Sequence, residues 1–257
     1  MKKLEIIAGF ILFSNMINAQ TIQLSDVVMF CDSPLKEDID PQSYQNYMLR
    51  EFIPAWNKSS PGSAVFLLKS DRGDKNGHYL TACVVDENAA ISFSGQNVFA
   101  DQGVNFLSNP GTYTEYHLIG AENMKQLPKV DLLGIHYLKI LPERALEFEK
   151  FVVEKLHPTV GDLVHDMNLL YYKAVDGQHA GSYITIYAIE SVPARERFWP
   201  TGGQEQEIVK ELFRPYRQLA LDLSDYLVPD SYLGPDSGGG AAYFESLEWT
   251  DYVVVQP

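Results

Sequence analysis

The strongest constraint on the fold of this chain is an internal repeat. The segment from Tyr44 to Asp86 recurs without a gap, 104 residues further on, as Phe148 to Glu190. Apolar positions match in class, first at helical spacing and then at strand spacing, and the change falls at the same place in both copies. Each copy is therefore predicted to be one helix followed by a β-hairpin. Six pairs are identical: Pro54/Pro158, Lys69/Lys173, Gly73/Gly177, Gly77/Gly181, Tyr79/Tyr183 and Thr81/Thr185.

The repeat continues into a strand before and a strand after each copy. Apolar runs precede both helices, and the closing strands match at an offset of 136, so the second copy holds 32 additional residues. Each half is predicted to run strand, helix, strand, strand, helical region, strand. The four flanking runs are 26–31, 132–140, 113–119 and 249–255. We predict a first half at residues 20–125 and a second at 126–257, with a helical insert at about 192–247.

Several helix boundaries follow from local signals. Pro54 and Pro158 are predicted to end their helices, because proline lacks an N–H donor. Gln204–Leu227 has the apolar spacing of an amphipathic helix, which Pro215 should kink. The matching region of the first half, Asn88–Pro110, is weakly periodic and predicts only a fragmentary helix.

This order of elements resembles the dimeric α+β barrel superfamily. Right-handed crossovers turn each half into a split βαβ sheet with its helices on one side. The uncovered side of each sheet needs a partner, and the other half is the nearest one. The resemblance implies an α+β fold in which two ferredoxin-like βαββαβ repeats form an intramolecular pseudo-dimeric barrel. It brings no catalytic signature with it.

The N-terminal residues 1–19 have the layout of a secretory signal peptide. Lys2 and Lys3 precede an apolar run, Ile6–Phe13, which is too short to span a bilayer, and a small-residue exit ends at Ala19. We therefore expect an exported protein, periplasmic or extracellular, with no membrane span. The choice between these two compartments stays open.

Charge and cysteine content limit the partners. The formal net charge of −14 argues against nucleic acid, because an acidic surface repels phosphate backbones. In an exported protein Cys31 and Cys83 are allowed to form a disulfide or to remain two buried thiols, and both interpretations stay open. Further oligomerisation is not excluded.

The second hairpin strand of each copy suggests where a ligand binds. Tyr183 and Tyr187 alternate with Ile184 and Ile186, and Tyr79 occupies the matching place in the first copy. We expect the aliphatic residues to pack under the helices and the tyrosines to line a cavity, since buried hydroxyls without partners are costly. The alternative is that these tyrosines are interface aromatics with satisfied hydroxyls. The predicted ligand-binding residues are His136, Tyr171, Tyr183, Tyr187 and Tyr79.

His136 is the one weak candidate for catalysis. It lies in an apolar strand, where an offset of 104 pairs it with Asp32, and tyrosines are expected on neighbouring strands. A hydrogen-bonded structural histidine is the competing interpretation. His157 is explained by the C-terminus of its helix, and the Lys69/Lys173 pair by solvated strand ends. No metal site and no cofactor is predicted, because HExxH, paired CxxC, GxxxxGK and GxSxG motifs are absent from the sequence.

Three functions remain. The first is an exported protein that binds a small, partly apolar or aromatic molecule between sheet and helices. The second is a cofactor-independent enzyme, monooxygenase-like or isomerase-like, that uses His136 and a tyrosine. The third is an interaction protein that exposes part of the apolar stripe of Gln204–Leu227 in its insert.

Overall fold

The computed structural model describes residues 22–85, 105–109, 113–120, 129–160, 167–201, 211, 214, 217–228 and 248–256. The predicted signal peptide, most of the weak helical region 88–110, the start of the Gln204–Leu227 helix and residues 229–247 lie outside these ranges. None of the described helices is long and apolar enough to cross a membrane.

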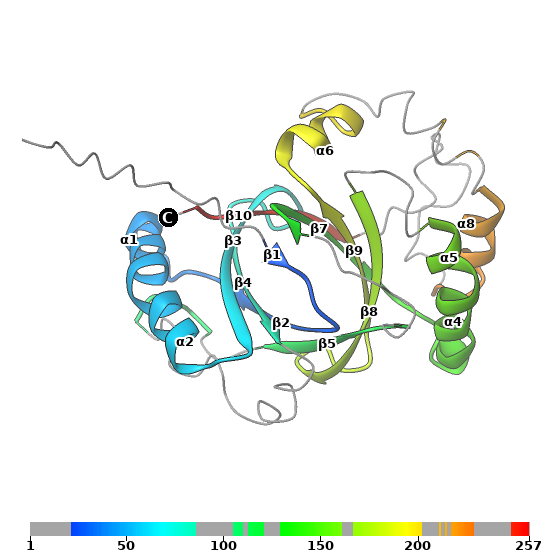
Figure 1. Ribbon diagram of the computed structural model, residues 1–257, viewed down its shortest axis with the longest axis horizontal. Helices are drawn as coiled ribbons and strands as arrows, with labels where there is room; N and C mark the ends of the chain where they lie inside the picture. The colour runs from blue at the N-terminus through cyan, green and yellow to red at the C-terminus, as the bar shows by residue number, and fades with distance from the viewer. Residues whose placement is uncertain are drawn as a thin grey trace, which may run out of the picture.

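Eight antiparallel strands form a closed barrel at the centre of the molecule (Figure 1). Their order around the barrel is β10-β3-β4-β2-β5-β8-β9-β7, and β10 closes the ring by pairing with β7. A separate two-stranded sheet pairs β1 (Ile22–Gln23) with β6 (Lys129–Val130). The barrel strands are β2 (Val27–Ser33), β3 (Ser63–Gly73), β4 (Tyr79–Val85), β5 (Thr114–Leu118), β7 (Leu132–Leu138), β8 (Met167–Gly177), β9 (Tyr183–Ile189) and β10 (Trp249–Val254).

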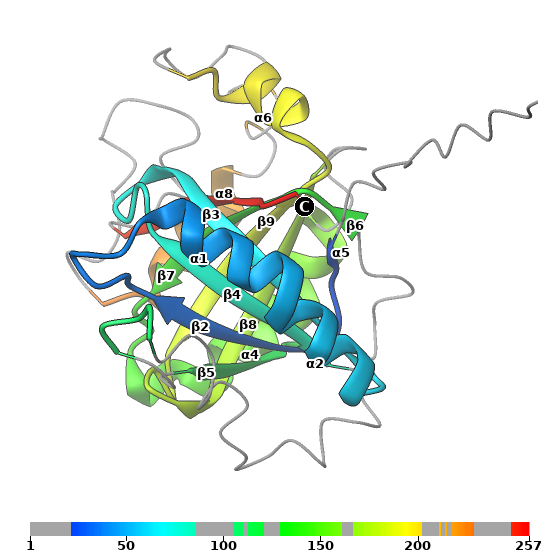
Figure 2. The same ribbon diagram turned by 90° about the vertical axis from the view of Figure 1, so that its left-hand side faces the viewer.

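Helices cover the barrel on two opposite sides (Figure 1). The first-half helix is continuous through α1 (Pro41–Tyr47), the π segment η1 (Met48–Phe52) and α2 (Ile53–Ser59), and Figure 2 shows it lying across its own strands. The opposite side carries η3 (Pro142–Arg144), α4 (Ala145–Phe151), the π segment η4 (Val152–Leu156), α5 (His157–Val160) and α8 (Arg217–Ser224). A further helix, α6 (Val192–Phe198), follows β9 directly.

The predicted helix ends at Pro54 and Pro158 are wrong. Both prolines lie inside continuous helices, each just after a five-residue π segment, and the two segments are 104 residues apart. A π turn is wider than an α turn, so it gives the proline ring room and absorbs the missing backbone donor. The irregularity is itself part of the repeat.

The repeat is also visible in the strand pairing. Each half orders its strands as second, third, first, fourth, and the halves join through β10–β3 and β5–β8. Both junctions carry a bulge at the matching place, and both place a positive-φ glycine against a carbonyl of the facing strand. The glycines are Gly73 and Gly177, at the predicted offset of 104.

The first strand of each half departs from that offset by one residue. In β2, Phe30 pairs with Ala82, and in β7, Ile135 pairs with Ile186, so these two strands match at an offset of 105. His136 therefore corresponds to Cys31 rather than to Asp32. Because side chains alternate along a strand, this single step moves the histidine to the other side of the sheet.

The predicted assignment of strand faces is inverted. Ile184, Ile186 and Ala188 lie in the barrel interior, whereas Tyr183 and Tyr187 point outward, under the helices. The barrel is narrow enough for side chains to fill it, so its inside takes the smaller aliphatic residues. The covered outer sides, where helices and strands meet, take the tyrosines.

Cys31 and Cys83 are both free and buried on the outer side of the first-half sheet. Burial raises the pKa of each thiol to about 12, which keeps both protonated at neutral pH. Cys31 and Cys83 are therefore two buried thiols and form no disulfide.

Candidate functional site

The predicted residues point to one covered surface of the barrel, the outer side of the second-half strands β7, β8, β9 and β10, hereafter the C-terminal face. Trp249, His136, Thr185 and Tyr171 are register partners on four adjacent strands and form one row across it. A second row, of Asp251, Gly134, Tyr187 and Leu169, runs beside it. The face therefore brings together three of the predicted residues, His136, Tyr171 and Tyr187.

The first half provides an internal comparison for this surface. Where the C-terminal face has His136, Tyr187 and Tyr171, the register of the first half has Cys31, Cys83 and Leu67. All three of those side chains are buried against α1, η1 and α2. Two sheets with the same strand order thus differ at these three positions, and only the second carries imidazole and phenol groups there.

The covering helix differs in the same way. His157 occupies the position of Ile53, and its ring lies 5.8 Å from that of Tyr171. It lies in the last turn of the described helix, as the sequence predicted, where an imidazole interacts favourably with the helix C-terminus. Phe148 packs edge-on against Tyr171 and Tyr183, with ring centroids 6.4 and 5.1 Å apart.

His136 lies in an aromatic setting at the β10 end of the face. Its ring is 4.6 Å from Tyr187 and 6.1 Å from Trp249, onto which it stacks. Its Nδ1 atom is buried and has no hydrogen-bond partner among the described residues. Burial lowers the pKa of His136 to about 3, so the imidazole is neutral at physiological pH. A neutral imidazole with an open nitrogen is able to accept or donate one hydrogen bond to a ligand.

The lowered pKa of His136 predicts a specific acid sensitivity. The unfolded chain binds a proton at this histidine below its ordinary pKa of 6.5, whereas the folded protein does so only below about 3. The stabilising contribution is present above 6.5 and is lost as pH falls between these values. His136→Phe should therefore lose less thermal stability than the wild type between pH 7 and pH 4, as measured by circular dichroism melting. Equal losses in the two proteins would contradict the assignment.

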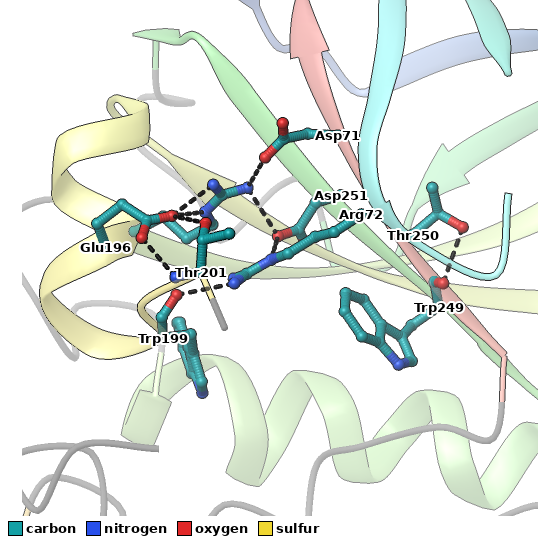
Figure 3. A network of polar contacts seen from close by, with 9 residues as sticks. Asp71, Arg72, Glu196, Trp199, Thr201, Trp249, Thr250 and Asp251 are labelled. Carbon is teal, nitrogen blue, oxygen red and sulfur yellow. Dashed lines mark hydrogen bonds and ion pairs between the residues drawn. The ribbon is translucent and has the colours of Figure 1, made fainter. Parts of the chain in front are cut away.

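A charged network fixes α6 at the same end of the face (Figure 3). Arg195 is buried, and its Nη1 atom donates to Asp71 Oδ2 at 2.6 Å and to Asp251 Oδ2 at 3.2 Å. Arg72 donates to the same Asp251 oxygen at 2.6 Å. Glu196 pairs with Arg195 and accepts from the backbone and hydroxyl of Thr201. The Thr201 backbone N–H above all, together with Arg195, lowers the pKa of Glu196 to about 2.

This network was not predicted from the sequence. Its partners come from three strands or helices and are 124 or 56 residues apart, so local spacing carries no sign of it. The one available signal was Arg195 itself, an arginine within the predicted insert at about 192–247. Gly134 belongs to the same region: a Cβ atom there would lie 3.0 Å from Asp251 Oδ1 and 3.3 Å from Tyr187 Cβ.

The opposite, β5 end of the C-terminal face opens into a groove of about 420 Å³. Glu149, Val153 and other residues of α4 and η4 form one wall, and His117 and Lys173 form the other. Glu149 Oε1 accepts from Lys173 Nζ at 2.7 Å and from the Tyr183 hydroxyl at 2.6 Å. Lys173 is therefore part of an ion pair rather than a solvated strand end. Burial, followed by the bond to Glu149, raises the pKa of Tyr183 and keeps it a phenol.

Tyr79 does not join this site. It lies in the first half, where Gln45 donates to its hydroxyl at 2.7 Å, and Lys69 lies 5.8 Å above its ring. The arrangement copies that of Tyr183, with glutamine in place of Glu149. Of the five predicted ligand-binding residues, four lie on the C-terminal face and Tyr79 lies under the helices on the opposite side.

Comparison with solved structures supports the fold. The chain resembles a proposed monooxygenase from Fusobacterium nucleatum, with a TM-score of 0.52 and 12% identity over 90% of this chain and 92% of that one. It also resembles a proposed chlorite dismutase, with a TM-score of 0.52 and 10% identity over 91% and 96%. No protein-family model matches the sequence, and the curated proteins give no match either. The chain thus has the fold of the dimeric α+β barrel superfamily, as the sequence predicted.

Proposed function

We propose that this protein binds a small, partly apolar or aromatic molecule between the C-terminal face and the helices that cover it. The observation that carries the proposal is the internal comparison. At matching positions the first half packs Cys31, Cys83 and Leu67, whereas the second places His136, Tyr187 and Tyr171. Packing alone does not require this exchange, because the first half is fully packed without it. Ligand binding gives the imidazole and phenol groups a role.

In this proposal the ligand enters through the groove at the β5 end of the C-terminal face. Its wall includes Ile119, whose backbone N–H donates to the carbonyl of Tyr171 at the end of the central row. Apolar groups of Leu118, Ile119 and Val153 line it together with a few charged groups, which is the usual composition of a small-molecule site.

The proposal includes the architecture and the location of the protein. We propose that each half is a ferredoxin-like unit, which the shared strand order and the matching π segments and glycines support. We also propose that the protein is exported, periplasmic or extracellular, on the sequence pattern of residues 1–19.

A cofactor-independent, monooxygenase-like reaction is the second candidate. It is favoured by His136 and Tyr187, whose ring centroids lie 4.6 Å apart, on a fold that a proposed monooxygenase shares. In such a reaction one atom of O₂ replaces two hydrogens of the ligand as a carbonyl oxygen. The other atom leaves with those hydrogens as water, so the ligand supplies the electrons.

Filling the groove tests the binding function. Val153→Trp should lower the affinity for 2-naphthol, used as a neutral aromatic probe, at least about tenfold, because the larger side chain occupies the ligand space. Leu49→Trp is the matched control, since Leu49 holds the same place in the π segment of the first half. Titration by isothermal calorimetry measures both variants, and native mass spectrometry of the purified wild type identifies any retained molecule.

The outcomes separate the two candidates. Binding lost only in Val153→Trp, with the ligand recovered unchanged in air, supports a binding protein. A ligand recovered with a new carbonyl group, and protected by His136→Phe, supports the oxygenase. Equal binding by the wild type and both variants, or equal loss in both, overturns the location of the site.

The third hypothesis, an interaction protein, requires part of the apolar stripe of Gln204–Leu227 to be exposed, and the described residues of that stripe do not support it. Leu223 of α8 is buried in the same core cluster as Phe148, and Leu219 and Tyr226 pack partly buried against that cluster. The described part of the predicted stripe thus docks on its own half of the barrel.

A further inference from the structure

The side chain that connects the two halves at the candidate site is Arg72. It belongs to β3 of the first half, yet both of its contacts are with the second half. Its Nε atom donates to Asp251 Oδ2 of β10 at 2.6 Å, and its Nη1 atom donates to the backbone carbonyl of Trp199 at 2.8 Å. One planar guanidinium therefore fixes the distance between a barrel strand and the residue that ends α6.

Trp199 links Arg72 to the C-terminal face through its contact with Tyr187. Its ring meets that of Tyr187 edge-on, with centroids 6.1 Å apart and planes at 88°. Tyr187 in turn contacts His136 at 4.6 Å. A shift in the Trp199 backbone therefore changes the aromatic wall around His136.

Helix α6, which ends just before Trp199, depends on tertiary contacts for its stability and position. α6 has seven residues, which is too short for a helix to be stable without tertiary contacts. Its buried Arg195 is bonded to Asp71, the neighbour of Arg72, and to Asp251. The hydrogen bonds that join Arg195 and Trp199 to the barrel thus converge on two consecutive residues of β3 and one of β10 (Figure 3).

The matching place, at the junction of β5 with β8, lacks this arrangement among the described residues. Asp71 and Arg72 correspond to Val175, which is 44% exposed, and to Asp176, which accepts from the Tyr113 hydroxyl. Asp251 corresponds to Glu115, which pairs with His117. The network and the polar face therefore occur together, on the same side of the barrel.

We propose that Arg72 is a positioning residue of the second-half site, supplied by the first half, and that it holds Trp199 against Tyr187. Its role in ligand binding rests on the proposed function, but its effect on Trp199 does not. Each half thus completes a single site, and the second half alone would lack the group that sets one wall.

Tryptophan fluorescence tests the positioning directly. In a Trp56→Phe, Trp249→Phe background Trp199 is the one remaining tryptophan of the chain. Adding Arg72→Met removes both donors while keeping most of the side-chain volume. Acrylamide quenching of Trp199 should rise about twofold or more as α6 loosens. Arg72→Lys, which is able to make only one of the two contacts well, should give an intermediate value.

Arg144→Met is the matched control. Arg144 also donates to a backbone carbonyl, that of Asp225, and to a carboxylate, Glu147, but on the side of the barrel that carries α8. Its loss should leave Trp199 quenching unchanged. Unchanged quenching in both Arg72 variants would overturn the proposal.

Ligand affinity separates this inference from the proposed function. Arg72→Met should weaken 2-naphthol binding about tenfold, and Arg144→Met should not. If the wild type binds no ligand but Trp199 is released in Arg72→Met, the proposed function fails and the positioning of Trp199 stands. If ligand binds and quenching is unaffected, the reverse holds.

Discussion

Alanine in place of Gly177 is expected to destabilise the protein by about 3 kcal/mol, because two costs add there. The residue has a φ of +89°, which an L side chain rarely adopts. Its Cβ atom would also lie 2.1 Å from the Tyr113 carbonyl oxygen, and that oxygen belongs to the backbone beside the bulge joining β8 to β5. Urea unfolding followed by circular dichroism measures the loss, together with any change in its cooperativity.

Gly181 supplies the control in the same hairpin. Its φ is +86°, but a Cβ atom there meets nothing within 4 Å, so Gly181→Ala should cost only about 1 kcal/mol. The first half offers the same pair of substitutions. A Cβ atom at Gly73 would lie 2.4 Å from the Trp249 carbonyl oxygen, whereas one at Gly77 would meet nothing within 4 Å. Equal costs at Gly177 and Gly181 would show that backbone conformation alone sets the effect. The strand junctions would then be more adaptable than the structure indicates.

Removing the Asp251 carboxylate should cost about 3 kcal/mol or more, because it leaves buried positive charge without its shared acceptor. One oxygen of Asp251 accepts from Arg72 and Arg195, and both the aspartate and Arg195 side chains are nearly inaccessible. Asp251→Ala therefore affects strand β3, strand β10 and helix α6 together. Thermal and urea unfolding of the purified variant give the change in the free energy of unfolding.

Glu115→Ala is the natural comparison. Glu115 has the matching place on β5 and is also buried, but its partner is His117, a half-exposed side chain. Its loss should cost about 1 kcal/mol, since the released imidazole is hydrated. A cost at Glu115 equal to that at Asp251 would mean that burial of the strand residue, and not the shared arginine pair, dominates.

The repeat predicted most of the strands and their order along the chain, because these depend on local spacing. One prediction was wrong because it depended on the exact position of a single residue in a strand. The offset of the first strand is 105, and one residue decides which side of a sheet a histidine occupies. The helix ends predicted at Pro54 and Pro158 were wrong for a different reason. A π turn accommodates proline, and the sequence of a π turn looks like that of an ordinary helix.

The candidate site was only partly accessible to sequence reasoning. His136 and Tyr187 stand where the two copies differ, so comparison of the halves pointed to them. Arg195 and Asp251 are joined through space, across 56 residues, and a buried ion pair leaves no periodic pattern. His157 was explained by a nearby helix end, and the described helix does end three residues later, at Val160, so its contact with Tyr171 was the part that the sequence did not indicate.

Closure of the barrel by β10–β3 and β5–β8 has a consequence for how the chain folds. The two outermost strands of each half pair with the outermost strands of the other half, so neither sheet has a free edge. The contacts that close the ring join segments about 60 and 180 residues apart in sequence. The fused halves should consequently gain and lose structure in one cooperative step, and the distant strand β10 must be in place before the first half is complete.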